Sequence, residues 1–148
     1  MDTPRRILCP VDFSDSSHQA LRVAAELARD WQATLVVLHV QERPLWMHEP
    51  YVHMPGDVRA ETLARGEAQL EQWKLDARQN GAPETIANLQ HGDPLDRIIA
   101  VAREDRDIGL IVLGTHGRTG LKRAMIGSVA ERVVRLAPCT VMVVRSRS

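Results

Sequence analysis

Glycines cluster in the last third of the chain, together with basic residues. The segment Gly114-Thr115-His116-Gly117-Arg118-Thr119-Gly120 is followed, after six intervening residues, by Gly127-Ser128. Glycine leaves no Cβ to hold a ligand away from the backbone, and convergent backbone N–H groups bind anions. A helix beginning at Gly127-Ser128 would add free N–H groups and a favourable dipole. The segment therefore predicts a site for a chain of phosphate groups, with added positive charge from Arg118, Lys122 and Arg123.

A structural interpretation of the same residues stays open. Ser128 begins the sequence Ser-Val-Ala-Glu, in which a serine caps a helix and the glutamate three residues later bonds back to it. In that case the glycines serve a tight turn and the basic residues form a solvated face. His116 either contacts phosphate or acts as a base, or it helps to form the turn.

Asp12 is the carboxylate at the end of the first apolar run. Two roles are open for it: contact with a metal ion or a ribose, or capping of the turn into the next helix together with Ser14. His48 and His53, with Glu49 between them, do not have the spacing of a zinc site. His39 is interpreted as a hydrogen-bonded, partly buried imidazole.

Strands and helices must place these residues at one edge of a sheet. Short, continuous apolar runs rich in Val and Ile indicate strands that are buried on both faces. The runs are Ile7–Val11, Thr34–Val40, Ile108–Leu113 and Thr140–Val144, with a weaker run Glu84–Gln90 near an edge. Between them, apolar residues recur at helical spacing. These stripes are Ala20, Ala24, Leu27, Ala28 and Trp31; Leu63, Gly66, Leu70, Trp73 and Ala77; Leu95, Ile98, Ile99 and Ala102; and Val129, Ala130, Val133, Val134 and Ala137.

Strands and helices therefore alternate along the chain, from a first strand to a last one. Ser14 and Asp93-Pro94 are predicted to begin two of the helices, and Asn80-Gly81 and Pro138 to follow the ends of two others. Right-handed crossovers between such strands give an α/β, doubly wound, Rossmann-like fold with helices on both faces of a parallel sheet. Ligands bind to such sheets at the carboxyl ends of the strands, where the strand order reverses.

Composition limits the classes of function. The chain has 148 residues, enough for a single domain, and 44% of them are hydrophobic. Lys+Arg and Asp+Glu both number 19, so no bulk charge favours nucleic acid or an anionic membrane as partner. No apolar run reaches the roughly 20 residues of a membrane helix, and no signal-peptide core follows the first residue, so a cytoplasmic location is expected. No lysine follows a glycine, which excludes the phosphate loop of the common NTPases.

The spacing Gly114-x2-Gly117-x9-Gly127-Ser128 resembles the nucleotide-binding signature of the universal stress protein family. Residues 7–14 are similar to the family's first strand and turn, residues 38–40 to the end of its second strand, and residues 138–144 to its final strand. The resemblance implies a five-stranded parallel sheet with strand order 3-2-1-4-5 and the branch of the family that binds ATP, with Mg²⁺ or Mn²⁺. It also implies a homodimer formed through the exposed edge of the last strand, Thr140 to Arg145.

The same resemblance implies which residues contact the nucleotide. Asp12 is expected near the ribose and the metal-bound phosphates, and the backbone of Val40 near the adenine. The pocket and the phosphate cradle are completed by Pro10, Val11, Gly114, Thr115, Gly117, Arg118, Gly127, Ser128 and Val129. With the implied strand order, Cys9 and Cys139 lie two strand spacings apart, about 9–10 Å, which is too far for a disulfide. Both are interpreted as small buried apolar residues.

The expected function is a regulatory module of the stress response that senses ATP, with no catalytic residue assigned. Two alternatives stay open: a slow ATPase or self-phosphorylating enzyme that uses Ser128 or a nearby hydroxyl, and an interaction protein without nucleotide. The connection from Gln41 to Gly56 holds Trp46, Tyr51 and three prolines. It is either a lid over a nucleotide or partner, or an ordinary excursion of the chain.

Overall fold

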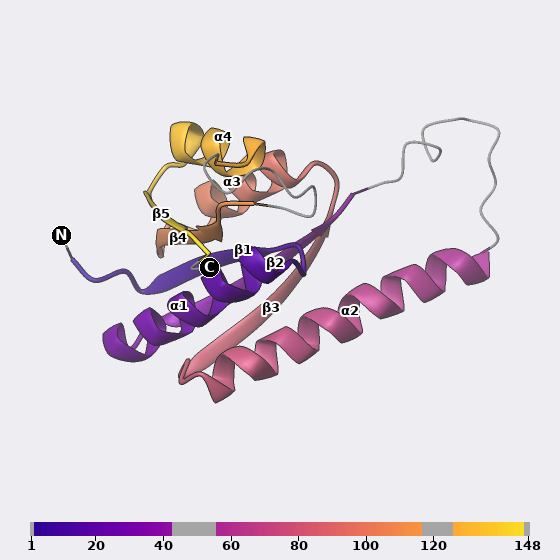
Figure 1. The fold of residues 1–148 in the computed structure, drawn as a ribbon, viewed down its shortest axis with the longest axis horizontal. Helices are drawn as coiled ribbons and strands as arrows, with labels where there is room; N and C mark the ends of the chain where they lie inside the picture. Colours follow the sequence, from indigo (N-terminus) through magenta and orange to yellow (C-terminus); the bar gives the residue numbers. More distant parts are fainter. Residues whose placement is uncertain (1, 43–55, 117–125, 147–148) are drawn as a thin grey trace.

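A five-stranded parallel sheet forms the centre of the computed structural model, which describes residues 2–42, 56–116 and 126–146 (Figure 1). The strands are β1 (Arg6–Val11), β2 (Thr34–Gln41), β3 (Glu84–His91), β4 (Ile108–Gly114) and β5 (Thr140–Val144). Their order across the sheet is β3-β2-β1-β4-β5, and every neighbouring pair is parallel. The predicted strands, the parallel sheet and the strand order are confirmed.

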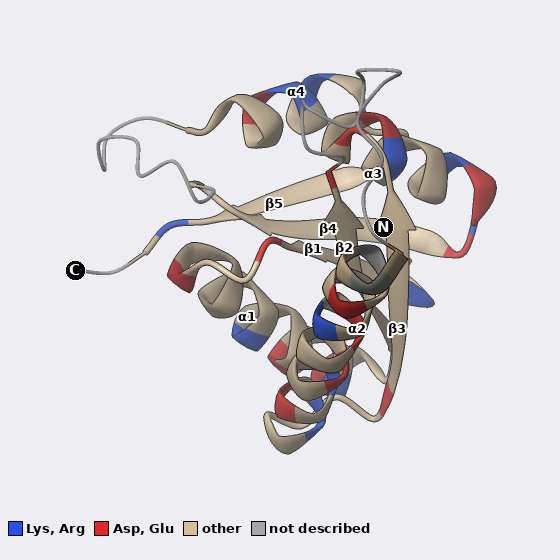
Figure 2. Cartoon of the chain, turned by 90° about the vertical axis from the view of Figure 1, so that its right-hand side faces the viewer, with Lys and Arg blue, Asp and Glu red and all other residues tan. Residues whose placement is uncertain are grey.

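Helices cover both faces of the sheet (Figure 2). On one face lie α1 (Asp15–Trp31) and α2 (Gly56–Gln79), and on the other lie α3 (Pro94–Glu104) and α4 (Ser128–Leu136). Each face has its own buried core, because successive residues of a strand point to opposite sides: Ile7 and Cys9 belong to the first core and Leu8 to the second. This double cover explains the continuous apolar runs. Within the described ranges, no helix is long and apolar enough to cross a membrane.

Two of the predicted helix starts are confirmed by their caps. The Ser14 side chain accepts the Ser17 N–H at the start of α1, and the Asp93 side chain accepts the Asp96 N–H at the start of α3. The start of α2 differs from the expectation, because the helix begins at Gly56, well before its predicted apolar stripe. Its first turns extend past the sheet (Figure 1), so the sheet imposes no apolar pattern on them.

The apolar residues of α4 point in two directions. Ala130 and Val133 are buried against the sheet, as predicted. Val129 is 38% exposed, Val134 is 51% exposed and Leu136 is 48% exposed. The stripe in the sequence is therefore wider than the face that the sheet covers, and part of it is left on the surface.

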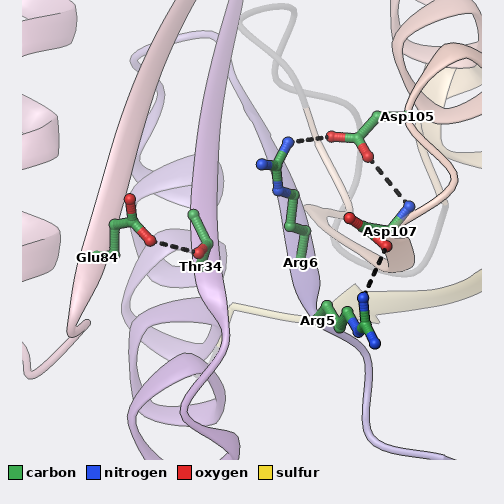
Figure 3. A network of polar contacts seen from close by, with 6 residues as sticks. All are labelled: Arg5, Arg6, Thr34, Glu84, Asp105 and Asp107. Atoms are coloured by element: carbon green, nitrogen blue, oxygen red, sulfur yellow. Dashed lines mark hydrogen bonds and ion pairs between the residues drawn. The ribbon is translucent and has the colours of Figure 1, made fainter.

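Polar contacts join the elements at the amino ends of the strands (Figure 3). Arg6 Nη1 donates to Asp105 Oδ2 at 2.6 Å, and the hydrogen bond and charge of Asp105 raise the pKa of Arg6. The Thr34 hydroxyl of β2 donates to the Glu84 carboxylate of β3 at 2.8 Å. A ligand is expected at the carboxyl ends of the strands, and these contacts lie at the opposite end of the sheet.

Both cysteines are free thiols. Cys9 is fully buried in β1, and Cys139, just before β5, is half-buried. Burial raises the pKa of both thiols, so little of either is the reactive thiolate at pH 8. The interpretation as a small buried apolar residue holds for Cys9, and it holds in part for Cys139.

We expect an aromatic disulfide reagent at pH 8 to label Cys139 slowly and Cys9 not at all in the native protein. Both thiols should react rapidly once guanidinium unfolds the chain, because exposure returns each pKa to its ordinary value. Absorbance of the released thiolate measures both rates. The variant Cys139→Ser should show no reaction before unfolding, and rapid labelling of two thiols in the native protein would contradict the burial of Cys9.

Candidate functional site

The sheet has its switch point between β1 and β4. The chain passes from β1 to β2 on one side of this pair and from β4 to β5 on the other side. The two connections therefore lead in opposite directions across the sheet. β1 stays paired with β2 up to Val11 and His39, but its pairing with β4 ends at Leu8 and Ile111. Pro10 has no N–H to donate to a neighbouring strand. The carboxyl ends of β1 and β4 are therefore not joined by ladder hydrogen bonds, at the place where sheets of this type bind ligands.

Asp12 lies at the carboxyl end of β1, in a turn that its own side chain closes. Its Oδ1 accepts the Ser14 N–H at 3.0 Å and the Ser14 hydroxyl at 2.5 Å. The Asp12 N–H donates to the Ser17 hydroxyl oxygen in the first turn of α1, at 3.3 Å. The capping role that the sequence left open is therefore present. The capping hydrogen bonds go to Oδ1 of Asp12. Contact of the carboxylate with a ligand stays a prediction.

Phe13 follows Asp12 in an unusual backbone conformation. Its φ of 64° lies in the left-handed region, which costs a bulky residue about 1–3 kcal/mol. The Phe13 ring packs against His39, with centroids 4.2 Å apart, and meets Trp73 of α2 edge-on at 5.2 Å. His39 donates from Nδ1 to the Val11 carbonyl at 2.8 Å, because a carbonyl can only accept. His39 is thus hydrogen-bonded, as predicted, and it is buried rather than partly buried.

The first turn of α1 also packs against the end of β4. A Cβ on Gly114 would collide with Ser16 Oγ and would lie 2.7 Å from the Ser16 carbonyl oxygen. The buried Ser16 hydroxyl accepts the His116 N–H at 3.3 Å. The packing of α1 thus requires glycine at position 114. Sequence analysis missed Ser16 and Ser17 as links between the two strand ends, and the serine-rich run after β1 was the signal that could have identified them.

Gly127 brings the start of α4 to the end of β4. Its N–H donates to the Thr115 carbonyl at 2.6 Å, and a Cβ on Gly127 would lie 2.9 Å from that oxygen. The capping interpretation of Ser128 is wrong: Gly127 is the N-cap residue, and Ser128 lies inside the helix, one position too late for a capping box. No side chain of the described residues caps α4. Helix N–H groups without a side-chain cap favour an anion.

Thr115 and His116 form a contact that sequence analysis did not anticipate. Thr115 Oγ1 and His116 Nδ1 are 2.7 Å apart, and Thr115 is buried. The Thr115 N–H donates to the Val144 carbonyl of β5 at 3.2 Å. The buried Thr115 thus holds one nitrogen of the imidazole at the start of the glycine-rich segment, and each role left open for His116 stays a prediction.

The structure connects four of the nine predicted site residues that it describes. Asp12, Gly114, Thr115 and Gly127 are connected through the first turn of α1 and the Thr115 carbonyl. The others are placed around this centre by the elements that carry them. They are Pro10 and Val11 at the end of β1, Val40 near the end of β2 with its side chain in the core beside α3, and Ser128 and Val129 at the exposed start of α4.

Part of the predicted site lies outside the described residues. This part comprises Gly117 and Arg118, with the basic residues Lys122 and Arg123 that follow. His48, His53 and most of the connection from Gln41 to Gly56, for which a lid and an ordinary excursion were both open, also lie outside the described residues. Where the chain is described, no three His, Cys, Asp or Glu side chains lie close enough together to hold a metal ion.

Known proteins match this chain over nearly its whole length. Residues 3–145 match the model of the Universal stress protein family. Universal stress protein YxiE of Bacillus subtilis is 36% identical over 148 residues, covering 95% of this chain and 98% of its own. The structure of universal stress protein UspA from Lactobacillus plantarum matches with a TM-score of 0.78 at 32% identity, covering 95% of this chain and 97% of that chain.

A structure with a bound ligand is also among the relatives. The universal stress protein from Archaeoglobus fulgidus, in complex with dAMP, matches with a TM-score of 0.69 at 26% identity, covering 98% of this chain and 100% of that chain. The family model, the sequence identity and the shared strand order all agree. This chain belongs to the universal stress protein family.

Proposed function

We propose that this protein binds an adenine nucleotide at the carboxyl ends of β1, β2 and β4, beside the start of α4. The observation that carries this proposal is the hydrogen bond from Gly127 to Thr115, which sets the start of α4, uncapped within the described residues, at the switch point of the sheet. Uncapped N–H groups and the helix dipole favour phosphate there. The complex of the Archaeoglobus fulgidus relative with dAMP supports an adenine nucleotide as the class of ligand.

The working ligand in this proposal is ATP with Mg²⁺. Arg118, Lys122 and Arg123 follow β4 in the sequence and supply charge for several phosphate groups. Mg²⁺ is commonly held by one or two carboxylates together with substrate phosphates, rather than by a cage of protein ligands. The described residues fit that pattern, with the Asp12 carboxylate at this end of the sheet and no cluster of three metal-ligating side chains. The metal ion would neutralise phosphate charge beside Asp12.

The strand register supports a place for the adenine. β1 and β2 pair Val11 with His39, so Val11 and Val40 are neighbours on adjacent strands at the switch point. In the proposal the Val40 backbone meets the adenine, and Pro10 and Val11 line the pocket. The phosphates are surrounded by Gly114, Thr115, Gly117, Arg118, Gly127, Ser128 and Val129.

Thermal unfolding with and without nucleotide tests this function. A ligand at a hundredfold excess over its Kd stabilises the native state by about 2.7 kcal/mol, which raises the Tm of a domain of this size by roughly 5–10 °C. We expect this rise with Mg-ATP and a smaller one with AMP or dAMP. Mass spectrometry of nucleotide released from the purified protein identifies the natural ligand. No rise with any adenine nucleotide would contradict the proposal.

We further propose that the bound nucleotide sets the state of a cytoplasmic regulatory module of the stress response and is not rapidly turned over. No catalytic residue is assigned from the sequence, and the Thr115 hydroxyl contacts one of the two ring nitrogens of His116. Single-turnover assays of wild type and Asp12→Ala test the point. Several turnovers a minute that depend on Asp12 would instead support an ATPase.

The edge strand β5 is the proposed contact of a homodimer, through Thr140 to Arg145. β5 is an edge strand of the sheet. The unpaired backbone N–H and C=O groups of an edge strand can pair with those of a second copy across a two-fold axis. Exposed apolar side chains flank this edge: Met142 on the strand itself, and Val134 and Leu136 on α4, which contacts β5. Apolar area of this kind is typical of a protein interface.

The substitution Met142→Glu is expected to raise the dimer dissociation constant about tenfold or more, equivalent to about 1.4 kcal/mol, because it brings like charges together across the two-fold axis. Sedimentation velocity over a range of concentrations measures the change. Ile86→Glu is the matched control, since Ile86 lies on the opposite edge strand, β3, and both residues are 37% exposed. Dissociation caused by Ile86→Glu but not by Met142→Glu would contradict the proposal, because it would place the dimer contact at the β3 edge.

A further inference from the structure

We propose that Trp73 of α2 is a positioning residue of the nucleotide site, which holds the Asp12 turn in place through the ring of Phe13. This inference rests on the proposed function, because it concerns the carboxylate assigned there to the metal-bound phosphates. Trp73 itself touches no predicted ligand-binding residue in the contacts described above. Its effect on the site passes through Phe13, the residue next to Asp12 in the chain.

The first step is the backbone of the turn. Phe13 has φ = 64°, and a bulky residue keeps such a conformation only where its surroundings fix it. Two rings fix it here, since His39 packs against the Phe13 ring and Trp73 meets it edge-on. His39 also holds the Val11 carbonyl on the other side of Asp12. The Asp12 backbone is thus clamped at both of its neighbours, from β2 and from α2.

The second step is what fixes Trp73. Its ring also meets the His18 ring of α1 edge-on, with centroids 5.0 Å apart. His18 Nε2 and Asp76 Oδ2 lie 2.5 Å apart, and Asp76 is three residues after Trp73 on α2. Residues three apart on a helix share a face, so one face of α2 contacts both α1 and the Phe13 ring. The rings form a continuous chain of contacts from α1 through Trp73 and Phe13 to the end of β2.

The consequence is a mechanical link between α2 and the nucleotide site. The Asp12 carboxylate is oriented by its hydrogen bonds to Ser14, and in this structure those bonds span the left-handed Phe13. Loss of the Trp73 ring removes one of the two supports of that residue. The turn can then relax toward an ordinary conformation, which carries the carboxylate away from the phosphates.

The variants Trp73→Ala, Trp73→Phe and Trp31→Ala separate positioning from simple packing. Trp31 is the matched control, because it is a half-buried tryptophan of the same apolar core, but it ends α1 beside the amino end of β2. We expect Trp73→Ala to weaken Mg-ATP binding about tenfold or more in calorimetry, with Trp31→Ala within about twofold of wild type. Trp73→Phe should restore binding, since it keeps a ring. If Trp73→Ala does not fold, Trp73→Leu takes its place, because it keeps apolar volume without a flat ring.

Amide hydrogen exchange provides a readout that needs no nucleotide. The N–H groups of Asp12, Ser14 and Ser17 all donate within the turn. We expect Trp73→Ala to accelerate their exchange about tenfold relative to Trp31→Ala at matched stability. Equal exchange in the two variants, or unchanged Mg-ATP affinity in Trp73→Ala, would overturn the proposal. If the wild type binds no adenine nucleotide, the proposed function fails, and the exchange rates alone decide whether Trp73 holds the turn.

Discussion

Replacing Gly114 by alanine is expected to lower the free energy of unfolding by about 1–3 kcal/mol, the usual cost of inserting a methyl group into a closely packed site. The added Cβ would collide with Ser16 Oγ and lie 2.7 and 2.8 Å from the Ser16 carbonyl oxygen and carbon. A side chain can rotate away from such a contact, but these backbone atoms move only if α1 moves. α1 would be pushed off the end of β4, and the bond from the His116 N–H to Ser16 would lengthen. Thermal unfolding should show a Tm lowered by roughly 2–4 °C for each kcal/mol lost.

Gly56→Ala is the control for this prediction. Among the described residues, no atom lies within 4 Å of the Cβ that would be added at Gly56, and its φ is not in the left-handed region. The substitution should leave stability unchanged or raise it by about 0.4–1 kcal/mol, because alanine restricts the unfolded chain. Equal Tm values for the two variants would show that α1 tolerates a side chain at position 114. In that case the requirement for glycine there would have to come from a ligand.

The sheet was predictable from the sequence, because burial on both faces leaves a local signal. Strands such as Thr34–Gln41 are apolar at successive positions, and only a doubly covered strand requires that. The early start of α2 was not predictable in this way. The first turns of α2 extend past the sheet, and Val58 in them is 42% exposed, so the core of the described residues imposes no helical spacing there.

α4 shows the limit of apolar periodicity. Val133 and Val134 are neighbours in one apolar stripe, yet Val133 is fully buried and Val134 is 51% exposed. An apolar stripe indicates that this face of the helix is buried, but it does not show whether the protein's own sheet or a second molecule buries it. The sequence therefore predicted the helix correctly but overestimated the width of the face that the sheet buries.

For the candidate site, the sequence indicated which segments meet at the edge of the sheet and not which side chains contact one another. Asp12 and Gly114 were identified by type and by position after a strand. The serine run after β1 was a signal for Ser16, but the contact of Ser16 with Gly114 depends on how α1 packs. The contact of Trp73 with Phe13 has no signal in the sequence, because it depends on the three-dimensional packing of α2. For Gly114 the packing also supplies a reason for glycine that is independent of any phosphate. A residue type in a motif therefore has more than one physical explanation, and only the neighbours distinguish them.

Asp12→Asn is expected to weaken binding of Mg-ATP about tenfold or more, with the free energy of unfolding within about 0.5 kcal/mol of wild type. The amide keeps an Oδ1 that accepts the Ser14 N–H, so the turn persists while the charge beside the metal-bound phosphates is lost. Asp12→Ala should lose the same affinity and also about 0.5–1.5 kcal/mol of stability for each hydrogen bond removed. Calorimetry and urea unfolding of the two variants therefore separate the ligand role of the carboxylate from its turn-closing role.

Without divalent metal the sign of the effect at Asp12 should reverse. A carboxylate near bare phosphates repels them, so in EDTA we expect Asp12→Asn to bind ATP as well as wild type does, or more tightly. Asp15→Asn is the control, since it removes the same charge from an exposed position in the first turn of α1. Its affinity should change little in either condition, because solvent screens an exposed charge. If Asp12→Asn and Asp15→Asn behaved alike with Mg²⁺ present, Asp12 would serve only to close its turn, and the metal would have to be held by other residues.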